Sequence, residues 1–181
     1  MTKRILLYEY VTGGGLINEA FRSNLYNEAN IMLTSMLKDS EDCSKISYHF
    51  FCDHRMNLSF KSNAIKIEKK NQKKIYNKRL IKSFDYVIPI LPESKKTLYS
   101  YVKFLNNNNI KSIISTPKTI SNISDKWLFY KICINYKIKT IPTYLDTKIL
   151  KGKVIVKDRF GEGCSYIKLY RNIKYIINNR Y

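Results

Sequence analysis

The strongest constraint on the fold is an alternation of short apolar runs with stretches whose apolar residues recur every three or four positions. The runs are rich in β-branched and aromatic residues, as strands are. They are KRILLYEYV (3–11), KISYHFFCD (45–53), NAIKIEK (63–69), DYVIPILPE (85–93) and IKSIIST (110–116). Strands that alternate with helices predict an open, parallel α/β sheet.

Helical stretches lie between several of these runs. Apolar residues in 25–37 fall at offsets of four, seven, eight, eleven and twelve from Leu25, which places them on one face of an amphipathic helix. A second apolar stripe runs from Leu98 to Leu105, and the basic stretch 74–84 predicts a further helix with a solvated face. We expect these helices to cover the sheet.

Two of the predicted strands have distinctive surroundings. In 63–69 the residues that alternate with the apolar ones include lysine, which predicts an edge strand. The nearly continuous apolar run 85–93 predicts a strand buried on both faces. Pro89 within that run indicates a strand end or an irregular pairing. Ligands of an open parallel sheet bind beyond the carboxyl ends of its strands, so we expect the Gly13–Gly15 loop and Glu93 at the binding edge.

The chain changes character after residue 117, which predicts a complete domain over 1–117 and an incomplete one over 118–181. Ser124 or Asp125 is placed to cap a helix in KWLFYKICINYK. The later segment KVIVKDRFGEGCSYIKL predicts a strand, a glycine loop and a second strand.

The order of these last elements, SDKWLFYKICINYKIKTIPTY followed by GKVIVKDRFGEGCSYIKL, resembles the opening of an ATP-grasp domain. In that family an Asp-Lys pair begins a helix, a Pro-Thr turn follows, and a strand ending in lysine runs into a glycine-rich loop. The resemblance implies that Lys126 and Lys157 contact the phosphates of ATP. It also implies that Gly161, Gly163 and Ser165 lie in the loop that closes over them.

The chemistry of a triphosphate fits these residue types. Lysine ammonium groups place point charges near phosphate oxygens, and a glycine loop presents backbone N–H groups without side chains in the way. The order differs from that of a Walker loop, in which Gly, Lys and Ser or Thr share one turn before a helix. Here the loop lies between two predicted strands.

The front of the chain resembles the pre-ATP-grasp domain of a subgroup that includes tyramine–glutamate ligase. The similarity lies in ILLYEYVTGGG, NEANIMLTSML and FDYVIPILPES. Because Glu9, Gly13, Gly14 and Gly15 are expected at the binding edge, we predict that they shape the acceptor-substrate side of the site. A rival hypothesis, a Rossmann-type dinucleotide site at this loop, lacks the Gly-x-Gly-x-x-Gly spacing, since position 18 is Asn18.

By this resemblance the reaction is an ATP-dependent ligation, in which a carboxylate becomes an acylphosphate and an amine then displaces phosphate to form an amide. The resemblance implies ATP and Mg²⁺ as cofactors and a small-molecule carboxylate and amine as substrates. Such catalysis rests on orientation and charge neutralisation, and we assign neither a catalytic residue nor a metal ligand in this chain.

The acidic residues of a complete ATP-grasp domain are missing from the end of the sequence. After Leu169 it contains no Asp or Glu, although magnesium normally takes carboxylate ligands. Three explanations are open: a truncated gene product, a second polypeptide that completes the site, or a non-catalytic role. Truncation fits best, and we do not expect this chain to catalyse the reaction alone.

The formal net charge of +19 at pH 7 raises an alternative, a basic α/β module that binds nucleic acid without catalysis. The aromatic content of 13% would also suit stacking on single strands. Against this, lysine, isoleucine, asparagine and tyrosine are abundant throughout, as in products of AT-rich genomes. Aromatic residues also fall at predicted core positions, namely Phe50, Phe51, Phe84 and Tyr136. Nucleic-acid binding is therefore the weaker hypothesis.

The expected location is the cytoplasm, without a membrane partner. No apolar run approaches the roughly 20 residues of a membrane helix, and the first run does not end at a signal-peptide cleavage site. The cysteines lack the paired spacing of a zinc site, so we expect free thiols at Cys43, Cys52, Cys133 and Cys164.

Overall fold

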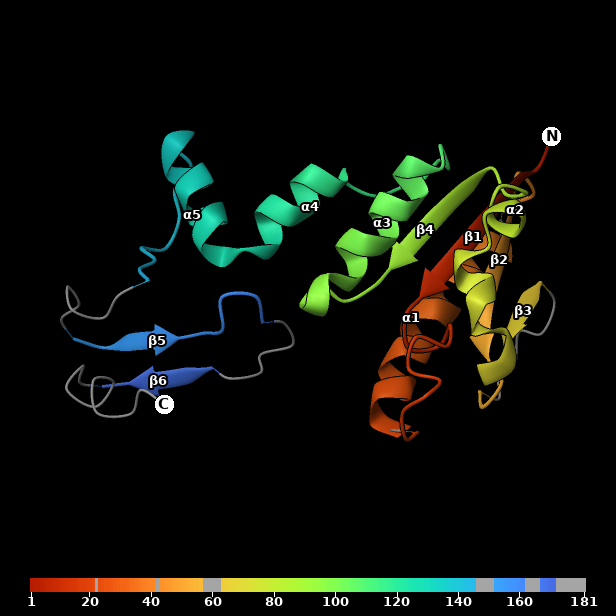
Figure 1. Ribbon diagram of the computed structural model, residues 1–181, viewed down its shortest axis with the longest axis horizontal. Coiled ribbons are helices and arrows are strands. Elements are labelled where there is room, and N and C mark those ends of the chain that lie inside the picture. The colour runs from red at the N-terminus through yellow and green to blue at the C-terminus, as the bar shows by residue number, and fades with distance from the viewer. Residues whose placement is uncertain (22, 42, 57–62, 146–151, 162–166, 172–181) are drawn as a thin grey trace. The chain divides into compact units, whose positions relative to one another are not determined.

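The computed structural model describes the chain except for residues 22, 42, 57–62, 146–151, 162–166 and 172–181. The chain forms two compact units (Figure 1). The first comprises Met1–Pro92 and Ser100–Ser115, and the second comprises Glu93–Tyr99 and Thr116–Tyr181.

A four-stranded sheet forms the core of the first unit. Its strands are β1 (Lys3–Glu9), β2 (Ile46–Asp53), β3 (Ala64–Ile67) and β4 (Tyr86–Ile90), in the order β3-β2-β1-β4. All three pairs of neighbours are parallel. The predicted open, parallel α/β sheet is therefore confirmed, and β3 lies at an edge, as its lysines indicated.

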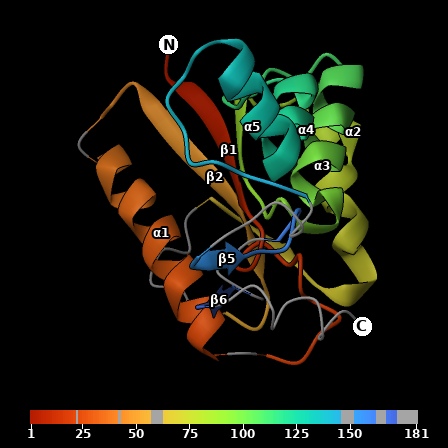
Figure 2. The same cartoon turned by 90° about the vertical axis from the view of Figure 1, so that its left-hand side faces the viewer.

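Alternation along β1 divides the core between the two faces of the sheet. Ile5 and Leu7 pack on one side with α1 (Ser23–Glu41), whereas Leu6 and Tyr8 pack on the other. That second side is covered by η1 (Lys69–Tyr76), α2 (Lys78–Ile81) and α3 (Thr97–Asn107). Figure 2 shows α1 on one side of β1 and β2, with α2 and α3 on the other.

The buried face of α1 differs from the predicted stripe. Leu25 is 37% exposed and Met32 is 46% exposed, whereas Tyr26 is only 2% exposed. The helix is turned so that the Tyr26 hydroxyl donates a hydrogen bond to Asp53 at the end of β2, at 2.9 Å. The predicted stripe is therefore confirmed at Ala29, Leu33 and Leu37, which are buried, and wrong at Leu25 and Met32.

The predicted basic helix over 74–84 is wrong as a single element. Residues 69–76 form the 3₁₀ helix η1, and a separate short helix, α2, follows. Asn77 divides them, because its backbone is extended and its side chain accepts a hydrogen bond from the Leu80 N–H at 3.0 Å. Asparagine is a strong N-cap residue, and this cap ends one helix and begins the next.

The predictions for 85–93 and 110–116 need correction. In β4 Val87 and Pro89 are buried on one face, whereas Tyr86 and Ile88 on the other face are only partly buried against the core. Pro89 lies inside the strand, in register with Tyr8. The run 110–116 forms only an isolated bridge between Ser112 and Val87.

The second unit contains helices and a two-stranded antiparallel sheet. Its elements are η2 (Ser94–Lys96), α4 (Pro117–Ser124), α5 (Lys126–Asn135), β5 (Val154–Val156) and β6 (Lys168–Tyr170). The capped helix and the two strands on either side of the predicted glycine loop are confirmed. Within the residues that the structure describes, no helix has the length and apolarity needed to cross a membrane.

Candidate functional site

The first turn of α5 is fixed by Asp125. Its carboxylate accepts hydrogen bonds from the N–H groups of Trp127 and Leu128, at 3.0 and 3.1 Å. This is the N-cap geometry that satisfies donors left free at a helix start. Lys126, the next residue, is thereby held at a fixed position on the first turn.

Arg159, which follows β5 in sequence, grips the same carboxylate. Its Nε lies 2.8 Å from Oδ1 of Asp125, and its terminal nitrogen lies 2.6 Å from Oδ2. The Arg159 hydrogen bonds, with those from the helix N–H groups, lower the pKa of Asp125 to about 2. A bidentate pair of this kind fixes direction as well as distance, so the start of α5 is tied to the segment after β5.

Lys126 also contacts the segment that follows β5. Its ammonium donates to the carbonyl oxygen of Gly161 and lies 3.5 Å from that of Arg159. Its backbone N–H also donates to the Arg159 carbonyl, at 3.3 Å. The structure thus brings Lys126 together with Gly161, two predicted nucleotide contacts separated by 35 positions.

The segment after β5 forms a tight turn that leads into the predicted loop. Lys157 is exposed and directly follows β5. Asp158 accepts a hydrogen bond from the Gly161 N–H on its carbonyl, at 3.3 Å. A Cβ at Gly161 would lie 2.7 Å from that of Asp158, so glycine is required by close approach. Gly163 and Ser165 lie outside the described residues.

In the first unit, Glu9 organises the loop that follows β1. It is only 4% exposed, and its carboxylate accepts from the N–H of Val11 at 3.1 Å and from the N–H and hydroxyl of Thr12 at 2.6 and 2.7 Å. A buried carboxylate needs such partners. Glu9 therefore acts as an anchor for the loop rather than projecting a free carboxylate.

The three glycines of this loop make close backbone approaches. Gly14 has a φ of 86°, and a Cβ there would lie 2.7 Å from Cγ2 of Ile67. The N–H groups of Gly13 and Gly15 donate to the carbonyls of Glu9 and Tyr10. The loop is thus held by its own hydrogen bonds.

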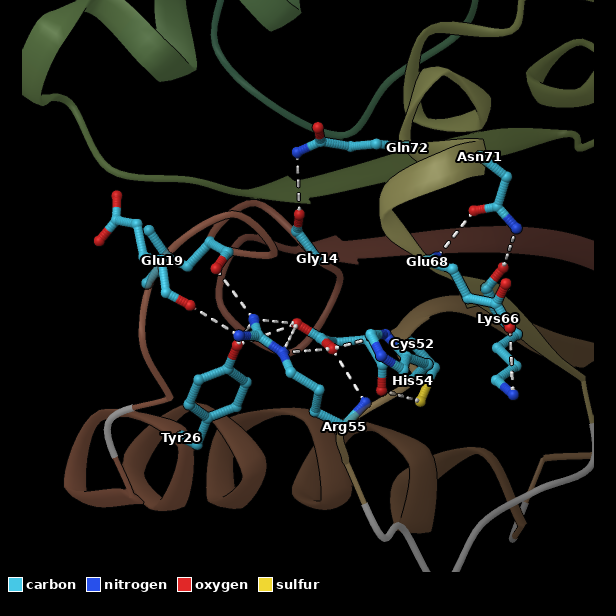
Figure 3. Close-up of polar contacts among 12 residues, drawn as sticks. Gly14, Glu19, Tyr26, Cys52, His54, Arg55, Lys66, Glu68, Asn71 and Gln72 are labelled. Carbon is cyan, nitrogen blue, oxygen red and sulfur yellow. Dashed lines mark hydrogen bonds and ion pairs between the residues drawn. The ribbon is translucent and has the colours of Figure 1, made fainter.

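A network around Arg55 joins the end of β2 to this loop (Figure 3). Asp53, which is fully buried, lies 2.6 Å from a terminal nitrogen of Arg55. The same guanidinium donates to the carbonyls of Leu16 and Glu19, at 2.9 and 2.7 Å, and to the hydroxyl of Tyr26. Arg55 therefore clamps the chain after β1 from a neighbouring strand.

Opposing effects act on the pKa of Asp53. Burial raises it, but hydrogen bonds from the side chain and backbone of Arg55 and from Tyr26 outweigh burial, so the pKa lies below its ordinary value. Burial and the hydrogen bond to Asp53 raise the pKa of Tyr26. The network therefore contains a charged pair and a neutral phenol at neutral pH.

A cavity of about 500 Å³, largely open to solvent, lies next to this network. It is lined by Ile17, His54, Arg55, Glu68, Lys69 and Lys70. His54 and Arg55 follow β2 directly, and Glu68, Lys69 and Lys70 follow β3, so the cavity lies at the carboxyl ends of adjacent parallel strands. Open α/β sheets bind ligands at this edge.

Comparisons with known proteins bear on the fold. No protein-family model and no curated protein sequence matches the chain. Its structure is similar to that of a protein from Archaeoglobus fulgidus assigned to the ATP-grasp superfamily, with a TM-score of 0.69 and 20% identity over 95% of this chain. It is also similar to D-alanine–D-alanine ligase from Bacillus anthracis, solved with ATP, with a TM-score of 0.51 and 12% identity over 98% of this chain.

The chain has part of an ATP-grasp fold. The similarity spans both units, but it covers only 50% and 54% of the two solved structures, so the chain spans about half their length. The ATP-grasp resemblance read from the sequence is thereby confirmed at the level of the fold.

The structure brings some of the predicted site residues together, and their functional roles stay predictions. Lys126 contacts Gly161, and Lys157 is exposed on the same segment. The contact of all three residues with a nucleotide stays a prediction. Glu9 and the glycines share one loop, as expected, but their contact with a substrate also stays a prediction. Cys43, Cys52 and Cys133 are free thiols, as expected, and Cys164 lies outside the described residues.

Sequence reasoning missed the roles of Arg55 and Arg159. Each is a lone arginine a few residues beyond a strand end, and each binds an aspartate bidentately. The signal was present in CDHR at the end of β2, where a charged pair follows an apolar run at the binding edge. For Arg159 nothing local pointed to Asp125, because the two are 34 positions apart.

The ATP-grasp fold does not favour the nucleic-acid alternative. Phe50, Phe51 and Phe84 are buried, as predicted, and are closed to stacking on bases. Tyr136 is 71% exposed, so its assignment to the core was wrong. It lies just beyond the last turn of α5, where the helix ends and the side chain leaves the packed face.

Proposed function

We propose that this chain binds ATP through Lys126, Lys157 and the loop 161–165, and that it contributes this site to a ligase that joins a carboxylate to an amine. The observation that carries the proposal is the contact of the Lys126 ammonium with the Gly161 carbonyl. It sets a positive charge at the base of a glycine-containing loop between two strands, the arrangement that a triphosphate requires.

The geometry of Lys126 leaves capacity for a phosphate. An ammonium has three N–H donors, and two of them face the carbonyls of Gly161 and Arg159. The third can donate to a phosphate oxygen while the first two keep the side chain in place. The Asp125–Arg159 pair supports this arrangement, because it fixes the start of the helix that carries Lys126.

In the proposed reaction the carboxylate attacks the terminal phosphate of ATP, ADP leaves, and the amine then displaces phosphate from the acylphosphate. The lysines would neutralise charge on the phosphates, the main contribution a protein makes to phosphoryl transfer. In the first unit, the Gly13–Gly15 loop would shape the acceptor side, with Glu9 acting through the loop that it anchors.

We assign no magnesium ligand. Within the described part of the chain, no three His, Cys, Asp or Glu side chains cluster closely enough to hold a metal ion. Since the chain spans about half the length of the solved structures that it matches, the complete ligation is proposed for an assembly that includes this chain, with the rest supplied by further sequence or by a second polypeptide.

Calorimetry with ATP, with and without magnesium, tests the proposal. We expect Lys126→Ala and Lys157→Ala each to weaken ATP binding by about tenfold, which corresponds to about 1.4 kcal/mol for one lost charge-assisted contact. Lys131→Ala is the matched control, because Lys131 is exposed on the same helix and lies over the Trp127 ring at 5.8 Å.

Two results would overturn the proposal. One is a folded wild-type chain that binds no ATP at millimolar concentration. The other is an ATP affinity that is the same in Lys126→Ala and Lys157→Ala as in the control Lys131→Ala. Circular dichroism of each variant separates a lost contact from a lost fold.

A further inference from the structure

The cavity at the carboxyl ends of β2 and β3 has the properties of a second ligand site, one that the ATP proposal does not use. Its volume of about 500 Å³ falls within the range of small-molecule sites. Residues that follow two adjacent parallel strands form its walls, and Ile17, from the loop after β1, adds an apolar surface.

The charges around this cavity favour an anion. Four cationic side chains, Arg55, Lys66, Lys69 and Lys70, accompany two carboxylates, Asp53 and Glu68, which leaves two positive charges in excess. Asp53 is already neutralised by Arg55. Glu68 is paired with Lys66 at 3.3 Å and with Lys70 at 3.1 Å. Neither carboxylate is therefore left to repel an incoming anion.

The walls are held in place before any ligand arrives. The hydrogen bonds of Arg55 to Asp53, Leu16 and Glu19 fix its guanidinium. Glu68 and Asn71 form a reciprocal capping box at the start of η1, which fixes the turn that carries Lys69 and Lys70. Preorganised walls lower the entropic cost of binding.

His54 supplies a further donor. Its Nδ1 lies 3.5 Å from Oδ1 of Asp53, and its side chain is 37% exposed. Because the two ring nitrogens lie on opposite sides of the imidazole, Nε2 points away from Asp53. In the protonated ring Nδ1–H faces the Asp53 carboxylate and Nε2–H is a second donor, which an anion in the cavity can accept from.

We propose that this cavity binds a small molecule through an oxyanion, either a carboxylate or a phosphate, held by Lys69 and His54 against the fixed surface of Arg55 and Ile17. The proposal stands on the first unit alone and is independent of ATP binding by the second.

Amide NMR titration of the full chain tests the site, with succinate and inorganic phosphate as separate probes at constant ionic strength. We expect saturable shifts concentrated on residues 54–55 and 68–70. Lys69→Ala should weaken binding about fivefold, as expected for the loss of one ion pair. Glu68→Gln should tighten it about twofold or more, because it releases the ammonium groups of Lys66 and Lys70 from their ion pairs with Glu68.

The controls distinguish this site from general attraction to a basic protein. Lys73→Ala removes an exposed lysine from the same 3₁₀ helix that does not line the cavity, and it should leave the affinity unchanged. Neutral succinamide should cause no comparable shifts. The probe that saturates at the lower concentration identifies the class of oxyanion.

Equal effects of Lys69→Ala and Lys73→Ala, or shifts spread evenly over exposed lysines with both probes, would overturn the proposal. The amide spectrum of each variant reports whether it is folded. ATP calorimetry with Lys69→Ala should match wild type, so the two proposals fail or stand separately.

Discussion

Tyr26 and Tyr101 are both buried in the first unit, but their hydroxyl groups have opposite surroundings. The Tyr26 hydroxyl donates to Asp53 and accepts from Arg55. The Tyr101 hydroxyl has no hydrogen-bond partner among the described residues. We expect Tyr26→Phe to lower the free energy of unfolding by about 1–2 kcal/mol, because it leaves charged partners unsatisfied.

Tyr101→Phe is the matched comparison. Removing an unpaired buried hydroxyl should leave the free energy of unfolding unchanged or raise it by up to about 1 kcal/mol. Urea unfolding followed by circular dichroism measures both variants. An equal loss in both would mean that the Tyr26 hydroxyl contributes nothing beyond its ring.

Gly14 combines a positive φ with close packing. Gly14→Ala would place a Cβ 2.7 Å from Cγ2 of Ile67 at a φ of 86°. We expect a loss of about 2–4 kcal/mol, from backbone strain and overpacking together. Gly152→Ala separates the two, since Gly152 has a φ of 84° but no heavy atom within 4 Å of the added Cβ. Gly152→Ala should lower the free energy of unfolding, measured with urea, by about 1 kcal/mol. A similar loss at both positions would mean that the contact with Ile67 contributes nothing to the effect at Gly14.

At the scale of elements, the link between α5 and the segment after β5 has a defined pH dependence. The Arg159 pair holds the folded pKa of Asp125 at about 2, below the ordinary value of 3.8. Because the folded value is depressed, the pair contributes stability above about pH 4, and this contribution is lost as the pH falls from 3.8 through 2.

Arg159→Gln should raise the pKa of Asp125 toward 3.8, as measured by the carboxyl ¹³C shift of Asp125 against pH. Lys153→Gln makes the same change of charge at an exposed residue just before β5 and should leave this pKa unchanged. A wild-type Asp125 that titrates near 3.8 would show that the pair does not form in solution.

Elements that depend on local signals were predictable, whereas those that depend on partners were not. β1 and β2 follow from apolar runs, and α5 follows from the Asp125 cap. The run 110–116 has the composition of a strand but forms one bridge, because only β4 is available to pair with it. The buried position of Tyr26 on α1 goes with a hydrogen bond to Asp53, which is 27 positions away in sequence. The pattern of apolar and polar residues along a helix does not reveal a polar partner that is distant in sequence.

For the whole molecule, the charge of +19 predicts weak, salt-dependent attraction to nucleic acid. Affinity for a labelled single-stranded oligonucleotide, measured by fluorescence anisotropy, should fall by about 10³-fold or more between 50 and 200 mM salt. Lys82→Ala, at an exposed position, should change it little. Binding that survives 200 mM salt and depends on base sequence would revive the nucleic-acid hypothesis.

The two candidate sites differ in how far they could be predicted from the sequence. The ATP segment carries its own pattern of lysines and glycines, so Lys126 and Gly161 could be named in advance. The cavity near His54 could not, because it is assembled from three strand ends whose adjacency follows from the strand order. Predicting it requires the topology first and the residues second.

The clamp of Arg55 on the chain after β1 also has a consequence for synthesis on the ribosome. Arg55 holds the carbonyls of Leu16 and Glu19, which precede it by 39 and 36 positions. At about 5–20 residues per second, these carbonyls emerge roughly 2–8 s before their anchor exists. During that interval the segment around Leu16 and Glu19 lacks its arginine anchor and is accessible to chaperones and proteases.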